Sequence, residues 1–339
     1  MIVSSDVAEP VNGANVISSL RIHNYRCFKR LHVKLAPLTV VIGKNDTGKS
    51  SFLRAILAWD WQQKDLTADD FFRRSSGASV EIAADFRDVS LTWSTEQAHR
   101  DQHFKVREKY LASNGLPRRL VQLFQFGPSG VPMASPVLAD ADVTPEFMSD
   151  GGNLPTLLDR FLRRDRRRFT QFVESARVQI AGLEDVNIRV PSPGQLAIDL
   201  SIDHGFDLDA GRASTGVRLM LFFVALSCHP ALSPVLLIEE PENGVHPQRL
   251  GEIMKVLRGI TRGAADSKPA QVILTTHSPY LLDHINLDTD QVLVFRRNDD
   301  GSRTAEPADK DRLKEFLDEF MLGEIWYNQS EEGLIKRGS

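Results

Sequence analysis

The chain has 339 residues, of which 42% are hydrophobic and 25% charged, and its formal net charge is −4. This length can bury a sizeable core, and the composition is that of a soluble globular protein. The slightly negative charge excludes a global positive field, so any contact with DNA needs a local basic patch. No apolar run reaches the roughly 18 residues of a membrane span, and the first residues lack the pattern of a secretory signal.

The N-terminal part is predicted to be a β-rich lobe with one inserted helix. Short strands bounded by turn-forming residues are expected at 16–22, 31–35 and 78–86. Residues 88–150 mix polar stretches with glycines and prolines, which predicts an irregular, partly helical insertion. Cys27 and Cys228 lie far apart without metal-ligand spacing, so we expect free thiols in a cytoplasmic protein.

The strongest motif of this lobe is a strand, a glycine-bounded loop and an amphipathic helix between Leu38 and Leu57. Gly43 and Gly48 let the backbone turn so that successive N–H groups point inward at an anion. Lys49 would reach the β- and γ-phosphates of a nucleotide, and the Ser50 hydroxyl would bind Mg²⁺. The alternative is a surface turn that happens to carry a lysine. The expected nucleotide-binding residues are Gly43, Lys44, Asn45, Asp46, Thr47, Gly48, Lys49, Ser50 and Ser51.

An arginine cluster follows on a segment, 154–180, that is expected to form one or two helices. Six arginines lie within nine residues between Arg160 and Arg168, and such a cluster can neutralise a nucleic-acid backbone. A solvated helix face is the competing and favoured interpretation, because arginine stems also cover apolar surface. The candidate DNA contacts are Arg163, Arg164 and Arg167.

The C-terminal part alternates helices and strands, which is typical of a parallel sheet with crossover helices. Expected strands are 186–190, 195–202, 234–238, 271–275 and 291–295, and expected helices are 217–226, 247–260 and 279–284. The apolar positions of a terminal amphipathic helix, suited to core packing or to docking a partner, are Leu313, Phe316, Leu317, Phe320 and Met321.

Three further motifs carry chemistry. An apolar strand ends at Glu239 and Glu240, where carboxylates can hold Mg²⁺ and polarise water. Another ends at His277, which suits a phosphate sensor, although a strand-end histidine is more often structural. Ser214 and Gly216 open a helix whose N-terminus can bind an anion, and a simple N-cap by Ser214 is the rival interpretation.

The order of these motifs resembles the ABC-type ATPase heads of the RecF, SMC and OLD kind, often described as AAA-family ATP-binding proteins. The likeness is carried by IHNYRCF (22–28), GKNDTGKS (43–50), ASTGVR (213–218), LLIEEPENGVHP (236–247) and TTHSPYLLD (275–283). It implies an α/β P-loop NTPase fold. The implied parts are a tail (1–15), an N-terminal lobe (16–87), a mostly helical insertion (88–182), a C-terminal lobe (183–300) and a C-terminal helix and tail (301–339).

The resemblance also implies roles for single residues. Lys49 and Ser50 match the Walker A lysine and the Mg²⁺ hydroxyl. Glu239 matches the Walker B carboxylate and Glu240 the catalytic glutamate, while His277 matches the switch histidine. Ser214 and Gly216 match the signature that completes the ATP site of a second subunit in a head-to-tail dimer. Arg26 is expected near the nucleotide, and 243–246 is expected to form the loop that crosses the dimer interface.

The sequence departs from the family pattern at several positions. Glutamate replaces aspartate at 239, which favours slow hydrolysis because Mg²⁺ geometry is strict. The signature is Ala-Ser-Thr-Gly rather than Leu-Ser-Gly-Gly, and the glutamine loop has only Gln122 and Gln125 as candidates. The segment between Walker A and the signature is too short for a long coiled coil. A Toprim nuclease, as in OLD-type proteins, would have to be a separate chain.

Two functions therefore compete. The favoured one is a Mg²⁺-dependent ATPase that dimerises around ATP, in DNA repair or anti-phage defence with a separate effector nuclease. The alternative is an ATP-binding scaffold or regulatory module with negligible hydrolysis. A transporter ATPase subunit fits less well, because its signature would differ.

Overall fold

The computed structural model describes residues 17–61, 66–74, 79–86, 89–114, 116–117, 119–138, 144–203, 205–263 and 267–311, with residues 313, 321–322, 326 and 334–335. The expected N-terminal tail and most of the expected C-terminal helix lie outside these residues. By their contacts the residues form two compact units. The first comprises Met1–Leu123, Ser233–Leu237 and Pro269–Ser339, and the second comprises Phe124–Leu232 and Ile238–Lys268. The domain boundaries expected from the sequence remain a prediction.

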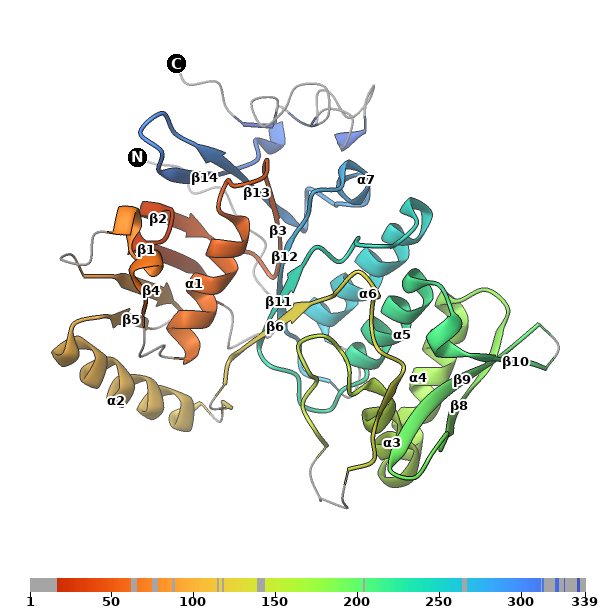
Figure 1. The fold of residues 1–339 in the computed structure, drawn as a ribbon. Coiled ribbons are helices and arrows are strands. Elements are labelled where there is room, and N and C mark those ends of the chain that lie inside the picture. The colour runs from red at the N-terminus through yellow and green to blue at the C-terminus, as the bar shows by residue number, and fades with distance from the viewer. Residues whose placement is uncertain are drawn as a thin grey trace. The chain divides into compact units, whose positions relative to one another are not determined.

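The first unit contains a four-stranded antiparallel sheet of order β2-β1-β4-β5 (Figure 1). Its strands are β1 (Ser19–Tyr25), β2 (Phe28–Lys34), β4 (Glu81–Asp85) and β5 (Ser90–Ser94). In β2, buried and exposed side chains alternate over most of the strand, as a half-buried sheet requires. Helix α1 (Lys49–Trp61) and helix α2 (Gln97–Ser113) pack on this sheet.

A six-stranded sheet of order β14-β13-β3-β12-β11-β6 positions the sequence motifs. β3 (Leu38–Ile42) pairs in parallel with β12 (Gln271–Thr275) and with β13 (Gln291–Arg297). Every residue of β3 and β12 is buried, which explains their continuous apolar sequence. The segments that follow β3 and β12 therefore leave the sheet at the same edge.

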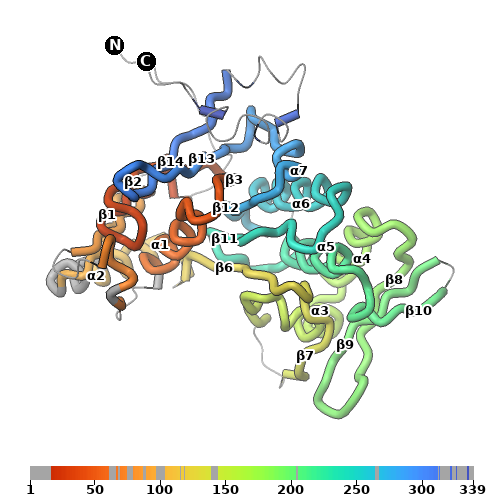
Figure 2. The backbone as a smooth tube through the Cα atoms, turned by 45° about the horizontal axis from the view of Figure 1, so that its top comes forward, coloured from red at the N-terminus to blue at the C-terminus, as the bar shows by residue number. Residues whose placement is uncertain are grey.

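Two strands of this sheet are absent from the sequence-based expectation. β14 (Arg303–Pro307) pairs antiparallel with β13 and lies beside β2, as both views show (Figures 1 and 2). β6 (Val121–Gln125) lies at the other end of the sheet, next to β11 (Val235–Glu239). β14 is short and mostly polar, so its local sequence carries little strand signal. β6 has apolar residues, but it lies in the segment that was expected to be irregular.

The second unit combines helices with a small antiparallel sheet. Its helices are α3 (Leu154–Arg164), α4 (Arg166–Gln179), α5 (Thr215–Ser227) and α6 (Leu250–Arg262). Its sheet joins β9 (Gln195–Ile202) to β7 (Ala134–Pro136), β8 (Leu183–Arg189) and β10 (Phe206–Asp209). Thus the segment expected to be a mostly helical insertion, 88–182, contains α2, α3 and α4 but also β5, β6 and β7.

Aromatic side chains fix α5 in the second unit. The rings of Phe124, Phe126 and Phe147 each lie 5.1 Å from Phe222 in an edge-on arrangement. Such pairs add stabilisation beyond the buried area alone. The helix that carries the signature motif at its N-terminus therefore rests on a rigid core.

The remaining elements are short. They are the 3-10 turns Ala68–Asp70, Phe72–Arg74, Ala210–Arg212 and Pro247–Arg249, and helix α7 (Pro279–Leu282). Within the described residues, no helix combines the length and the apolar character that a bilayer crossing requires.

Candidate functional site

The loop after β3 has the backbone that a phosphate-binding loop needs. Gly43 has a φ of 149° and Gly48 a φ of 101°, both in the region that favours glycine. A Cβ atom at Gly43 would lie 2.5 Å from the Phe295 carbonyl oxygen, and one at Gly48 would lie 2.7 Å from the Cys27 sulfur. Space and dihedral angle thus both require glycine at the two ends of the loop.

Lys49 lies inside this loop rather than on the surface. Its side chain is 5% exposed, and Nζ donates hydrogen bonds to the carbonyl oxygens of Gly43 at 2.7 Å and Lys44 at 2.9 Å. A buried ammonium is costly unless it is well hydrogen-bonded. The lysine is therefore folded back onto the loop rather than exposed, whereas Lys44, Asn45 and Asp46 at the loop tip are exposed.

Two contacts brace the tip of the loop. Thr47 Oγ1 donates to the Lys44 carbonyl oxygen at 2.8 Å, closing the turn. Arg303, on β14, donates from Nε to the carbonyl oxygen of Asp46 at 2.7 Å. Asp46 has a φ of 62°, a conformation that a non-glycine residue keeps only when its surroundings hold it. Sequence reasoning missed Arg303, because its strand could not be recognised locally.

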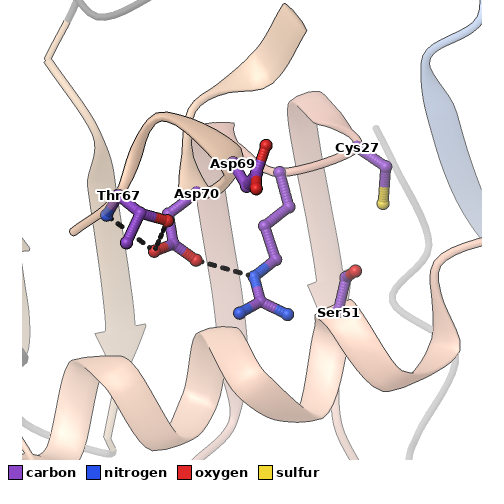
Figure 3. Close-up of a pocket in the computed structure, with 6 residues that line it drawn as sticks. Cys27, Ser51, Thr67, Asp69 and Asp70 are labelled. Atoms are coloured by element: carbon purple, nitrogen blue, oxygen red, sulfur yellow. Dashed lines mark hydrogen bonds and ion pairs between the residues drawn. The ribbon is translucent and has the colours of Figure 1, made fainter. Parts of the chain in front are cut away.

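A pocket of about 650 Å³ lies beside the start of α1 (Figure 3). It is lined by Arg26, Cys27, Ser51, Thr67, Asp69 and Asp70. The structure thus brings Arg26, which the sequence motif indicated, together with Ser51 of the helix that follows the loop. The volume is within the range of about 300–1,000 Å³ that small-molecule sites occupy. Burial raises the pKa of the Cys27 thiol, so this side chain is neutral at pH 7.

His277 follows β12 and belongs to the same unit as the loop. Thr275 lies opposite Val41 in the parallel ladder, and the N–H of Thr276 donates to the Val41 carbonyl oxygen at 3.1 Å. His277 is half-buried. It therefore leaves the sheet at the edge where the phosphate loop leaves β3.

The carboxylates of the acidic motif lie in the second unit, at the end of β11. Gln125, the last residue of β6, donates from Nε2 to the Glu239 carboxylate. Glu240 has a φ of 47°, and its carboxylate accepts a hydrogen bond from Asn243 Nδ2 at 3.0 Å. Strained backbone of this kind concentrates at functional sites. Of the two candidate glutamines, Gln125 is the one that contacts the acidic motif.

The signature segment lies at the N-terminus of α5. Ser214 is exposed, and its Oγ accepts from the Val217 N–H at 3.4 Å, so it caps the helix as the simpler interpretation expected. Gly216 is buried beside Val245 and Arg249. The start of the helix therefore packs on the loop that follows Glu240, and an exposed capping serine remains accessible to a second molecule.

The arginine cluster divides into exposed and structural members. Arg163, Arg164 and Arg167 are exposed, and Arg163 pairs with Asp159 at 2.8 Å. Arg168, in contrast, is buried and donates from Nη1 to the Cys228 carbonyl oxygen at 2.7 Å. The candidate DNA contacts thus share an exposed surface, while Arg168 fixes α4.

The described residues contain no group of three or more histidine, cysteine, aspartate or glutamate side chains that could hold a metal ion alone. The oxygen donors that the motifs supply are the Ser50 hydroxyl and the Glu239 carboxylate. Mg²⁺ in phosphate sites commonly takes one or two protein ligands and completes its shell with water and phosphate oxygens. Ser50 belongs to the first unit and Glu239 to the second, so their joint role as Mg²⁺ ligands stays a prediction.

Two segments of the chain match family models of ATPase domains. Residues 134–283 match the family model described as "AAA domain, putative AbiEii toxin, Type IV TA system", and residues 16–114 match the one described as "AAA ATPase domain". No curated protein matches the chain.

Two solved SMC head structures have the same fold. An SMC head bound to the C-terminal winged-helix domain of ScpA has a TM-score of 0.56 and 14% identity, covering 88% of this chain and 99% of its own. An SMC head with an extended coiled coil, bound to the C-terminal domain of ScpA from Pyrococcus furiosus, has a TM-score of 0.54 and 12% identity, with coverage of 89% and 98%. The chain thus has the fold of these SMC heads, as the sequence motifs indicated, and two of its segments are similar to AAA-family ATPase domains.

Proposed function

We propose that this chain binds ATP with Mg²⁺ and hydrolyses it to ADP and phosphate. The observation that carries the proposal is the phosphate loop, in which the buried Lys49 ammonium already lies on the loop carbonyls. An arriving polyphosphate would replace these carbonyls as the acceptor for Lys49, while the loop amides and the start of α1 bind the same anion.

Individual residues of the chain have separate roles in the proposed reaction. Lys49 stabilises charge on the transferring phosphoryl group, and Glu240 orients the attacking water. Ser50 and Glu239 would hold Mg²⁺, which neutralises charge on the phosphate oxygens. His277 would contact the γ-phosphate. The hydrogen bond from Gln125 to Glu239 links β6 to the acidic motif, so Gln125 is proposed as the missing glutamine-loop residue.

The pocket lined by Arg26 and Ser51 is proposed to hold the nucleoside end of ATP. Ser51 comes one residue after Ser50, beyond the lysine that reaches the β- and γ-phosphates, so its side of the helix faces away from the γ-phosphate. The volume of about 650 Å³ accommodates a ribose and a base. The guanidinium of Arg26 is suited to stack on a base.

ATP is further proposed to join two copies of the chain head to tail. Ser214 and Gly216 of one copy would complete the phosphate site of the other, because the exposed Ser214 and the N-terminal amides of α5 form an anion site that its own unit does not occupy. Closure on binding and opening on hydrolysis would make the dimer a nucleotide switch.

We propose that the dimer passes its nucleotide state on through two contacts. One is DNA, bound by exposed arginines, and the other is a second protein. Arg163, Arg164 and Arg167 would bind DNA through its phosphates, which predicts a steep loss of affinity with salt. The named SMC heads are bound to a domain of ScpA, and we propose that this chain likewise works with a separate effector, such as a nuclease, in DNA repair or defence. Charge reversal of the three arginines should flatten the salt dependence, and unchanged binding would remove them from the proposal.

An ATP-binding scaffold with negligible hydrolysis is the second candidate. It is favoured by Glu239, whose side chain is longer than the usual aspartate and is engaged by Gln125. Strict octahedral geometry makes Mg²⁺ sensitive to such a change.

Steady-state ATP hydrolysis separates the two functions. The purified chain is assayed with Mg²⁺, with and without double-stranded DNA, beside Lys49→Ala as the blank and Glu240→Gln as a trap. An ATPase shows turnover that Lys49→Ala abolishes, and Glu240→Gln retains ATP and the dimer without turnover. If the wild type matches its blank while binding ATP, the scaffold is correct; wild-type turnover by Glu240→Gln would refute the role of Glu240.

A further inference from the structure

Two neighbouring aspartates line the pocket beside α1, and their surroundings differ sharply. The side chain of Asp70 is 5% exposed and pairs with Arg26, with 3.0 Å between Oδ1 and Nε. The side chain of Asp69 is 73% exposed and pairs with the equally exposed Arg74. Figure 3 shows dashed bonds on Asp70 but none between Asp69 and the other residues drawn. Of the two aspartates, therefore, only Asp70 has a side chain that is buried in the wall of the pocket.

Asp70 is held by both its side chain and its backbone. Its Oδ2 accepts from the N–H of Thr67 at 3.0 Å and from Thr67 Oγ1 at 3.2 Å. Its carbonyl oxygen accepts from the Arg26 N–H at 2.8 Å. Asp70 thus clamps the turn after β1 to the segment that follows α1, and its buried carboxylate is satisfied by protein donors.

Arg26 needs such a clamp. It has a φ of 49°, which a non-glycine residue adopts only when the surrounding structure imposes it. Its guanidinium also lies 5.5 Å from the centre of the Tyr25 ring, which supports it from a second side. Arginine loses considerable side-chain freedom when it binds a ligand, so fixing it beforehand lowers the cost of binding.

We propose that Asp70 is a positioning residue for nucleotide binding, which holds Arg26 in place for the nucleoside end of ATP. The inference rests on the proposed function, because it assigns a task to a residue behind the ATP pocket. The ion pair engages Nε, so the Nη1 and Nη2 groups are not used by Asp70 and remain for the ligand. Thr67 completes the hydrogen bonding of the Asp70 carboxylate. The negative charge of Asp70 therefore stays beside Arg26 and does not face the phosphates of ATP.

The test measures dissociation constants for ATP and for inorganic tripolyphosphate by calorimetry, on the full chain. The variants are Asp70→Asn, Arg26→Ala, their double variant and, as the matched loss of one negative charge, Asp85→Asn, whose pair with Arg21 is not part of the pocket lining. Steady-state KM and kcat for ATP are measured in parallel. The same constants are measured for Lys49→Ala, because this variant tests the phosphate loop rather than the pocket.

Asp70→Asn is expected to weaken ATP binding about tenfold, the order that loss of one hydrogen bond to a charged group produces. Tripolyphosphate binding should change less than about twofold, KM should rise, and kcat should stay the same. Asp85→Asn should bind ATP like the wild type, because Asp85 does not line the pocket. In the Arg26→Ala background, Asp70→Asn should have no further effect, because its action passes through Arg26.

The inference is overturned if the effects of Asp70→Asn and Arg26→Ala add independently, if Asp85→Asn weakens ATP binding as much as Asp70→Asn does, or if tripolyphosphate binding is weakened as much as ATP binding. A wild type that binds no ATP refutes the proposed function itself, whereas ATP binding unaffected by Asp70→Asn refutes only this inference. If Asp70→Asn does not fold, Thr67→Val replaces it in the same cycle. Thr67→Val must weaken ATP binding in the wild-type background but not in the Arg26→Ala background, and an equal loss of affinity in both backgrounds overturns the inference.

Discussion

Replacing Asp60 by asparagine should destabilise the first unit by about 3–5 kcal/mol, the cost of removing one partner of a buried ion pair. The Asp60 side chain is 0% exposed and that of Arg107 is 3% exposed, with 2.5 Å between the paired atoms. The same carboxylate accepts from the backbone N–H groups of Leu120 and Val121 at 3.1 Å. The substitution would leave the Arg107 cation without its anion inside the protein and disturb the start of β6.

Urea unfolding followed by tryptophan fluorescence measures this loss, since all four tryptophans lie in the first unit. With a slope of about 2 kcal/mol/M, the midpoint should fall by about 2 M. Asp69→Asn is the matched control, because its pair with Arg74 is exposed and contributes only about 0–1 kcal/mol.

The double variant Asp60→Asn with Arg107→Met supplies a second check on the reasoning. It removes both charges, so it should be less destabilised than the sum of the two single variants. If Asp60→Asn unfolds at the same urea concentration as Asp69→Asn, the buried pair does not stabilise the unit as argued.

Three further outcomes follow from the contacts. Burial lowers the pKa of His229 in the folded protein. The stability that its neutral ring gives is therefore present above about pH 6.5 and is lost as the pH falls through the folded-state pKa. Circular dichroism during urea unfolding should show this loss in the wild type and not in His229→Gln. Arg168→Ala should cost about 2–3 kcal/mol, because it removes a charged hydrogen bond to the buried Cys228 carbonyl, whereas the exposed Arg163→Ala should cost under about 1 kcal/mol; equal losses would contradict the division of the cluster. Gly48→Ala should abolish measurable ATP binding by calorimetry, because its Cβ would meet the Cys27 sulfur at 2.7 Å, and retained binding would show that the loop can adjust.

The strands and helices with strong local patterns could be predicted from the sequence. The limits expected for the strands at 38–42 and 271–275 are those of β3 and β12, because buried parallel strands are continuous apolar runs. β14 was missed because a short polar strand depends on its neighbours rather than on its own sequence. β6 was missed although it is mostly apolar, because five residues do not distinguish a strand from other buried structure. The sequence also could not decide which glutamine, Gln122 or Gln125, contacts the acidic motif. The two differ only in the residues that lie beside them in the fold.

The sequence by itself predicted the phosphate loop, the order of the motifs and the resemblance to ATPase heads, because each rests on residue types at fixed spacing along a continuous segment. The tertiary structure alone decided which charges are buried. It set Asp70 against Arg26 and left Asp69 in solvent, and it buried Arg168 while Arg163, Arg164 and Arg167 stayed exposed. Burial depends on contacts between residues far apart in the chain, and the environment of a charge determines whether it holds a fold together or meets a ligand.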